Sequence, residues 1–249
     1  MYEGFLEVSG VPLPQTLLGT SPFIGAAQFG HRARLYQLDL YSNPANMLKI
    51  IQISYDMGVR GIQLLPHPPV IEALEMARNE GMKLDIVGTV RPEQELEDIQ
   101  LLASLDAKAM LLHATITDKG DWDLIEESLG FIKDNKALPG LATHRPFQTT
   151  QNLLDSPVLD LFEVYMMPIN RLGYLMDCEQ NLEKERAHLR SMTLELDKTV
   201  IAKKILAAGI MTPEDAFEYL KTLDYVDMVT LGIASEKEAQ ETWDTLKKK

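Results

Sequence analysis

The stretch AMLLHATITDKGDWDLIEESLGFIKDNKALPGLATH, residues 109–144, decides the fold. Short apolar runs at 109–112 and 138–143 are typical of buried strands, and the polar and apolar residues between them alternate with helical spacing. Each run is followed by a histidine, His113 or His144. A strand, a helix and a second strand predict a βαβ unit, in which the two strands are parallel and their carboxyl ends share one edge.

The same alternation extends along the whole chain in both directions. Strands are predicted at 17–24, 61–65, 84–89, 109–112, 138–143, 161–167, 200–205 and 226–232. Helices are predicted at 46–57, 69–79, 92–105, 122–133, 148–154, 178–192, 212–222 and 236–247. Eight such pairs, with no linker between them, predict an α/β protein: a single (β/α)8 TIM barrel domain over residues 1–249. An open doubly wound sheet is the alternative.

Composition limits the classes of partner. The chain has 37 acidic and 24 basic residues, a net charge of −13, which disfavours nucleic acid and anionic membrane surfaces. Its first residues, MYEGFLEVSG, have no basic segment followed by an apolar one, so we expect no secretory signal. It has no apolar run long enough for a membrane span and one cysteine, Cys178. We therefore expect a cytoplasmic protein that binds a small-molecule metabolite, and a homo-oligomer stays open.

Four histidines follow apolar runs, which predicts a site at the carboxyl-terminal rim of the barrel. They are His31, His67, His113 and His144, whereas His188 lies in a charged helical stretch and is expected in solvent. His67 is flanked by prolines that stiffen its loop and is a candidate for substrate binding. For any one of them, a hydrogen-bonded structural histidine is the alternative.

The loops after 109–112 and 138–143 carry further charged residues. Asp118 follows His113 in the same loop, where it could orient the imidazole, so His113, His144 and Asp118 are candidate catalytic residues. Arg145 is a candidate for binding a carboxylate or phosphate group of the substrate, or it pairs with an acidic loop residue.

Three later strands also end in polar groups. Lys203 and Lys204 are adjacent in an apolar run, so alternation places one inside the barrel, where a desolvated amine suits proton transfer, imine formation or anion binding. Asn170 follows the strand at 161–167 and is a candidate for substrate binding. The last strand leads to a helix, and backbone N–H groups there predict an anion or cofactor phosphate site. Its candidate residues are Gly232, Ser235 and Lys237.

Imidazole and carboxylate groups at one rim also predict a divalent metal such as Zn²⁺ as an alternative cofactor. The candidate ligands are His113, His144, Asp118 and His67, with one coordination position open to water.

The order of several motifs resembles the aldo/keto reductase superfamily over nearly the whole chain. They are Leu18-Gly19-Thr20, Ser54-Tyr55-Asp56-Met57-Gly58-Val59, Leu111-Leu112-His113, Pro168-Ile169-Asn170, Ile201-Ala202-Lys203-Lys204 and Gly232-Ile233-Ala234-Ser235. The resemblance implies a barrel fold and a nicotinamide cofactor, NAD(P).

The resemblance also implies a catalytic tetrad of Asp, Tyr, Lys and His, which this chain mostly lacks. Gln63 stands where the Asp is expected, and Gln63 is instead a candidate for substrate binding. The sequence PHPP at 66–69 replaces the Tyr loop, and Val90 or Arg91 falls at the position of the Lys. His113 alone remains, so ordinary carbonyl reduction is not expected.

Three functions stay open. The first is an enzyme that uses His, Asp and Lys for acid–base or lyase chemistry on a small anionic metabolite, with or without a metal. The second is an NAD(P)-dependent oxidoreductase with a non-standard site. The third is a non-catalytic binding or scaffold protein.

Overall fold

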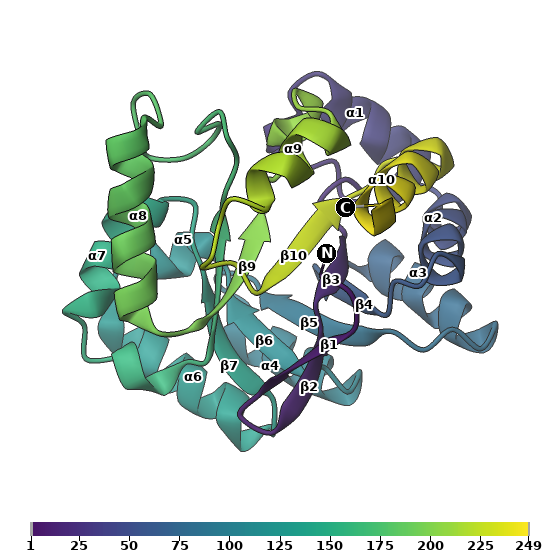
Figure 1. Cartoon of the computed structure of the whole chain (residues 1–249). Helices are drawn as coiled ribbons and strands as arrows, with labels where there is room; N and C mark the ends of the chain where they lie inside the picture. The colour runs from purple at the N-terminus through teal and green to yellow at the C-terminus, as the bar shows by residue number, and fades with distance from the viewer. Residues whose placement is uncertain (1, 249) are drawn as a thin grey trace.

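Eight parallel strands form a closed barrel in the computed structural model, which describes residues 2–248 (Figure 1). Neighbours follow the order β10-β3-β4-β5-β6-β7-β8-β9, and parallel pairing of β10 with β3 closes the ring. The strands are β3 (Thr16–Gly19), β4 (Gly61–Leu64), β5 (Asp85–Val90), β6 (Ala109–Leu112), β7 (Leu138–Ala142), β8 (Val164–Pro168), β9 (Thr199–Lys203) and β10 (Met228–Gly232). The predicted (β/α)8 barrel is confirmed, and the open sheet is wrong.

Helices surround the barrel (Figure 1). The longer ones are α2 (Pro44–Asp56), α3 (Pro68–Asn79), α4 (Glu95–Ser104), α6 (Trp122–Asp134), α7 (Pro146–Leu154), α8 (Glu183–Leu196), α9 (Pro213–Leu220) and α10 (Glu236–Lys248). Short helical segments are η1 (Ala27–Phe29), α1 (Arg32–Tyr36), η2 (Gln37–Tyr41), α5 (Ala114–Thr117), η3 (Leu159–Leu161) and η4 (Ala207–Gly209).

The strands separate two apolar clusters because successive side chains point to opposite faces of a sheet. Leu17, Leu111 and Met228 belong to the cluster that fills the barrel. Leu18 and Leu112, one residue further along their strands, belong to the larger cluster shared with the helices. This alternation fixes which residues can face the barrel mouth where the strands end.

Local signals in the sequence set several helix ends. Thr212 caps α9, since its hydroxyl accepts a hydrogen bond from the Asp215 N–H at 3.2 Å, as the Thr-Pro-Glu-Asp motif predicts. The following Pro213 suits the first helical turn, where no N–H donor is needed.

An amino-terminal hairpin, which the sequence analysis did not predict, adds to the barrel. Strands β1 (Phe5–Val8) and β2 (Val11–Pro14) pair antiparallel, and Val8 and Leu13 join the cluster inside the barrel. The hairpin meets the start of β8, because the Ser9 hydroxyl donates to Glu163 at 2.9 Å. It therefore closes the end of the barrel opposite the predicted rim site.

Some predicted bounds are wrong. The first barrel strand ends at Gly19 rather than at residue 24, and the apolar run that leads to His31 forms turns, with Gly25 at φ +59°. The strand predicted from 161 begins at Val164, because Leu159–Leu161 is a 3-10 turn. The helix predicted from 178 begins at Glu183. In the first two cases apolar residues pack on the core from a turn, which periodicity alone does not distinguish from a regular element.

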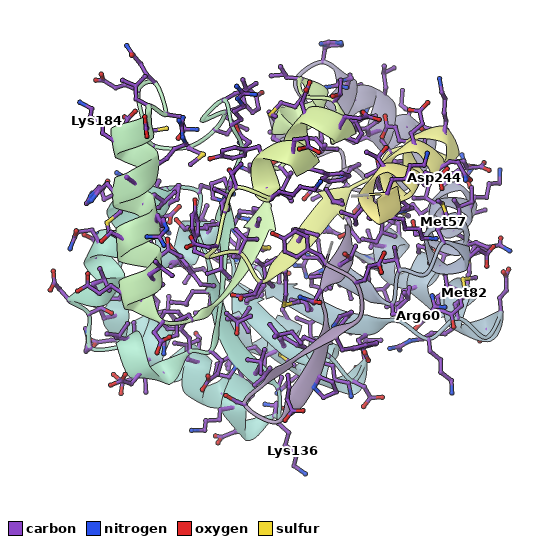
Figure 2. All side chains as sticks on the ribbon, viewed as in Figure 1. Met57, Arg60, Met82, Lys136, Lys184 and Asp244 are labelled. Carbon is purple, nitrogen blue, oxygen red and sulfur yellow. The ribbon has the colours of Figure 1, made fainter. Side chains whose placement is uncertain are left out.

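Charged side chains project from the outer surface, as Figure 2 shows for Lys136, Lys184 and Asp244. Within residues 2–248, no helix combines the length and hydropathy that a membrane crossing requires.

Candidate active site at the carboxyl-terminal rim

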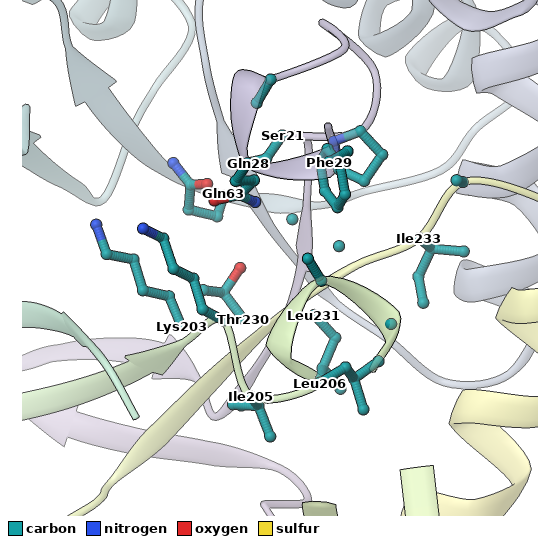
Figure 3. Close-up of a pocket in the computed structure, with 18 of the residues that line it drawn as sticks. Ser21, Gln28, Phe29, Gln63, Lys203, Ile205, Leu206, Thr230, Leu231 and Ile233 are labelled. Carbon is teal, nitrogen blue, oxygen red and sulfur yellow. The ribbon is translucent and has the colours of Figure 1, made fainter. Parts of the chain in front are cut away.

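A cavity of about 700 Å³ lies at the carboxyl ends of the barrel strands, a volume typical of small-molecule sites (Figure 3). Polar side chains from six strand ends or the residues just after them line it: Gln63, Thr89, His113, His144, Lys203, Lys204 and Thr230. The segment after β3 covers it, and Arg32 from this segment donates a hydrogen bond to the Ala208 carbonyl across the mouth.

His113 and His144 lie side by side in this cavity, as the sequence predicts. Their ring centroids are 5.5 Å apart and the rings are nearly perpendicular, at 83°. Nδ1 of His113 lies 3.2 Å from the Thr115 nitrogen and 2.8 Å from the Thr115 hydroxyl, and accepting the backbone N–H leaves the proton of the neutral ring on Nε2. The His144 ring makes no hydrogen bond to the described residues and is open to a ligand.

Both imidazoles are neutral at neutral pH. Burial, followed by the charge of Lys203, lowers the pKa of His113 to about 4 and that of His144 to about 3. Neutral imidazoles accept and donate hydrogen bonds, and the lowered pKa makes His144 a weak base at neutral pH.

Both lysines face the same cavity, which corrects the expectation that one would point outward. Strand β9 ends at Lys203, and Lys204 adopts a left-handed backbone conformation with φ 58°. This change of direction ends the two-residue alternation, so the second side chain also lines the cavity.

The two amines have lowered pKa values. Burial, with repulsion from Lys204, lowers the pKa of Lys203 to about 7, and burial lowers that of Lys204 to about 8. Neither Nζ makes a hydrogen bond or ion pair with residues 2–248, and Lys203 extends toward Gln63 in Figure 3. At pH 7 the cavity therefore holds one amine that is about half neutral, Lys203, beside one that stays mostly protonated, Lys204.

Gln63 and Thr89 form a neutral pair on the neighbouring strands. Gln63 Nε2 donates to Thr89 Oγ1 at 2.7 Å. On β5 the residue that faces the cavity is Thr89, whereas Val90 packs toward the helices and Arg91 forms a bidentate pair with buried Asp98 at 2.7 and 2.8 Å. Thr89 is thus the residue of β5 that faces the cavity, at the side where the resemblance implies a lysine.

Asp118 supports the site from outside the cavity rather than orienting the His113 ring. Its carboxylate accepts hydrogen bonds from the His144 N–H at 3.0 Å, the Thr149 hydroxyl at 2.8 Å and the Thr143 hydroxyl. Asp118 therefore fixes the loop after β7 and, through it, the backbone that carries His144.

Other predicted binding residues are engaged elsewhere. Arg145 is exposed and bonded to Gln148. Asn170 is buried, and both ends of its amide bind the Tyr174 backbone, at 3.0 and 2.8 Å. His31 is exposed at the start of α1. None of these residues lines the cavity.

The four candidate metal ligands are not brought together. His67 lies against the Tyr41 ring, with centroids 6.1 Å apart, outside the cavity, and the Asp118 carboxylate is bonded as described. Within residues 2–248, no group of three His, Cys, Asp or Glu side chains is placed to hold a metal ion.

The predicted anion site after β10 does not fit a phosphate group. Gly232 lines the cavity, but Glu238 accepts the Ala234 N–H at 2.9 Å and donates its own N–H to the Ser235 hydroxyl at 3.2 Å. Lys237 is 83% exposed and pairs with Glu241 at 3.6 Å. A carboxylate of this chain thus occupies the N-terminus of α10, where a cofactor phosphate would need a free N–H and no negative charge.

Thr89 and Thr230 line the cavity but are not among the residues predicted from the sequence. Each stands two residues after an apolar side chain that fills the barrel, Val87 and Met228 respectively. A polar residue at such an alternate position near a strand end is the signal that could have identified both.

These features define a (β/α)8 barrel protein with a lysine- and histidine-lined cavity at the rim that carries the chemistry of such barrels. The sequence matches no protein-family model and no curated protein significantly. Solved structures, however, share the fold, and it is the fold of aldo-keto reductases.

Three comparisons illustrate the likeness. A candidate aldo-keto reductase from Pseudomonas aeruginosa is 15% identical, with a TM-score of 0.63 over 98% of this chain and 96% of that one. A mutant of Gox0644 in complex with NADPH is 12% identical, with a TM-score of 0.64 over 99% and 89%. The aldose reductase from Schistosoma japonicum is 14% identical, with a TM-score of 0.57 over 96% and 87%. The resemblance in sequence motifs is thus confirmed at the level of the fold.

Proposed function

We propose that the protein is an enzyme in which Lys203 forms an imine with a small carbonyl compound and a neighbouring histidine moves a proton at the adjacent carbon. The observation that carries this proposal is an amine without an ion pair beside two neutral imidazoles in one ligand-sized cavity. Lyase and tautomerisation reactions of carbonyl compounds share this step.

Lys203 is the better nucleophile of the two lysines. With a pKa of about 7, about half of its amine is neutral at neutral pH, and only a neutral amine attacks a carbonyl carbon. Lys204, with a pKa of about 8, stays mostly protonated at pH 7. It supplies a proton to the departing oxygen and a positive charge that favours an anionic substrate.

The atoms balance as follows. Nζ of Lys203 adds to the carbonyl carbon, and the carbonyl oxygen leaves as water with one proton from Nζ and one from Lys204. The product is a protonated imine that draws electrons from the adjacent carbon. His144, a weak base because of its lowered pKa, accepts the proton that the cationic imine has made acidic. The electron pair of the broken C–H bond forms the C=C bond of an enamine, and the π electrons of the imine move to its nitrogen.

The two histidines have different roles in this proposal. The unbonded ring of His144 is the base, whereas His113 has its Nδ1 engaged with Thr115 and presents Nε2–H as a hydrogen-bond donor. The perpendicular arrangement of the rings lets the His113 donor and the His144 acceptor act on neighbouring atoms of one substrate.

The second candidate is an NAD(P)-dependent oxidoreductase, which the shared fold with an NADPH-bound protein favours. Against it stand the Glu238 carboxylate at the N-terminus of α10 and the bonded Asn170 amide. The missing tetrad residues leave no proton donor of the expected kind. We expect no NADPH oxidation in proportion to enzyme with simple aldehydes, and clear oxidation would support this second candidate.

Imine formation is tested by trapping. The protein is incubated with pyruvate or benzaldehyde and sodium cyanoborohydride, and the adduct is located by peptide mass analysis. We expect labelling of Lys203 in the native protein and none at the rim in Lys203→Met. Lys237→Met, which alters an 83% exposed lysine, is the matched control and should label like the native protein. Labelling spread evenly over surface lysines would contradict the proposal, and trapping without proton exchange would indicate a binding protein.

A further inference from the structure

Thr230 carries an unsatisfied hydroxyl in the candidate active site. It is 7% exposed and lines the cavity, yet its Oγ1 has no hydrogen-bond partner among residues 2–248. A buried polar group without a partner destabilises the folded protein, and where it lines a cavity, as Thr230 does, a ligand can supply the partner.

The neighbouring strand keeps space open beside this hydroxyl. Gly19 on β3 pairs next to β10, and a Cβ at Gly19 would approach Thr230 Oγ1 to 2.9 Å and the Gly232 nitrogen to 3.2 Å. Any side chain at Gly19 would therefore crowd the position from which a ligand reaches the hydroxyl.

The cavity has two chemically different parts. Figure 3 shows Lys203, Gln63 and Thr230 close together, while Phe29, Leu206 and Ile233 extend the wall on the other side. The carboxylates that line it, Glu238 and Glu241, are already bonded to the Ala234 N–H and to Lys237. Two amines and a free hydroxyl thus form a donor-rich part next to an apolar one.

From this arrangement we infer that Thr230 is a substrate-binding residue and that the substrate is a 2-oxo acid with an apolar side chain. The Thr230 hydroxyl donates a hydrogen bond to the substrate carboxylate, and the Lys204 ammonium pairs with the same group. The adjacent carbonyl carbon then faces Lys203, and the apolar side chain lies against Phe29 and Ile233. The position of the carbonyl carbon beside Lys203 rests on the proposed imine chemistry, whereas the carboxylate subsite at Thr230 does not.

The carboxylate subsite is tested with a ligand that cannot form an imine. Binding of 3-phenylpropanoate is measured by calorimetry with the native protein and with Thr230→Val, which removes the hydroxyl and keeps the shape. We expect the Kd to rise about tenfold or more, because the lost hydrogen bond is to a charged group. Thr117→Val removes the other buried hydroxyl without a partner, outside the cavity, and should leave the Kd unchanged.

The stability of the same variant separates a role of the hydroxyl in binding from a role in holding the fold. Thr230→Val should raise the Tm by about 2–4 °C, because an unsatisfied buried hydroxyl is replaced by a methyl group. A gain in Tm together with a loss of binding supports the inference. An unchanged Kd in Thr230→Val, or an equal loss in Thr117→Val, overturns it. Should Thr230→Val fail to fold, Gly19→Ala provides the same test, with weaker binding expected.

Substrate class is tested by competition in the trapping assay. Phenylpyruvate should label Lys203 at lower concentration than either pyruvate, which lacks the apolar group, or phenylacetaldehyde, which lacks the carboxylate. Equal labelling by phenylacetaldehyde and phenylpyruvate would overturn the carboxylate subsite. If no carbonyl compound labels Lys203 but 3-phenylpropanoate binds through Thr230, the imine proposal fails and the carboxylate subsite stands.

Discussion

The cavity and the loops that surround it differ in whether certain polar side chains are hydrogen-bonded within the chain. In the loops, Asp118, Asn170 and Arg91 have their side chains bonded to other parts of the chain. In the cavity, Lys203 and Lys204 make no hydrogen bond to the described residues, and the Thr230 hydroxyl has no partner. Polar side chains thus support the fold in the loops, whereas these three side chains of the cavity remain available to a ligand.

This difference separates function from stability in a way that can be measured. A side chain with bonded partners holds the fold, so its removal should lower the free energy of unfolding. A cavity side chain that is buried without partners costs stability, and we expect it to be kept for what it binds. Substitutions in the two regions are therefore expected to shift stability in opposite directions.

The largest effect is expected from His144, whose ring is unbonded. His144→Gln should slow the exchange of substrate α-protons with D₂O by about 10²- to 10⁴-fold, because it removes the base, while trapping at Lys203 persists. Proton exchange is followed by NMR with phenylpyruvate. His188→Gln changes an exposed histidine and should exchange at the native rate. Normal exchange in His144→Gln would assign the base to another group.

The supporting region is tested at Asp118. Asp118→Ala should lower the free energy of unfolding by about 3 kcal/mol, because the Thr143 and Thr149 hydroxyls and the His144 N–H lose their acceptor. Asp118→Asn retains one acceptor oxygen, so its free energy of unfolding should fall by less than that of Asp118→Ala. Urea denaturation measures both, and equal stability of Asp118→Ala and the native protein would contradict the supporting role.

The sequence contained most of the information on the barrel. Eight apolar runs alternate with helical patterns, and the period of two residues within each strand sends His113, His144 and Lys203 to the inner face. The hairpin was not predicted, because Pro12 and Pro14 lie within its second strand and proline is uncommon in strands.

Long-range partners explain why the site was predicted less well. The roles of Asp118 and Asn170 depend on Thr149 and Tyr174, and their contacts form only after the loops have folded. Lys204 turned inward because a non-glycine residue adopted φ 58°, a conformation that local sequence rarely specifies. Residue types at strand ends therefore locate a site, whereas the direction of each side chain depends on the folded loops.

Substitution of Lys203 should change the free energy of unfolding in the opposite direction from substitution of Asp118. The pKa of Lys203 falls from 10.5 to about 7 on folding, so the unfolded chain binds more protons between these values. The free energy of unfolding then rises as pH increases from about 7 to 10.5. Below pH 7 the full cost of burying the charged amine is present. Because Lys203 is partly exposed, Lys203→Met should stabilise the protein by about 2 kcal/mol at pH 6, less than the full shift implies.

Denaturation of Lys203→Met at pH 6 and pH 10 provides the measurement. The gain at pH 6 should exceed the gain at pH 10, where part of the penalty has already been relieved. Lys237→Met, with its exposed side chain, should show the same stability as the native protein at both values. A gain that does not change with pH would mean that packing, rather than the charge of the amine, causes it.

The smallest effect is expected at the border between the two regions, where Glu238 lines the cavity but is bonded within the chain. Glu238→Ala should lower the free energy of unfolding by about 1 kcal/mol, because the Ala234 N–H loses its acceptor and the N-terminus of α10 loses a negative charge. Glu236→Ala removes a charge from the same helical turn and leaves that hydrogen bond intact, so it should cost less. With the N–H free and the carboxylate gone, inorganic phosphate should raise the Tm of Glu238→Ala more than that of the native protein. An equal response to phosphate in both proteins would mean that the carboxylate does not keep anions from this end of the cavity.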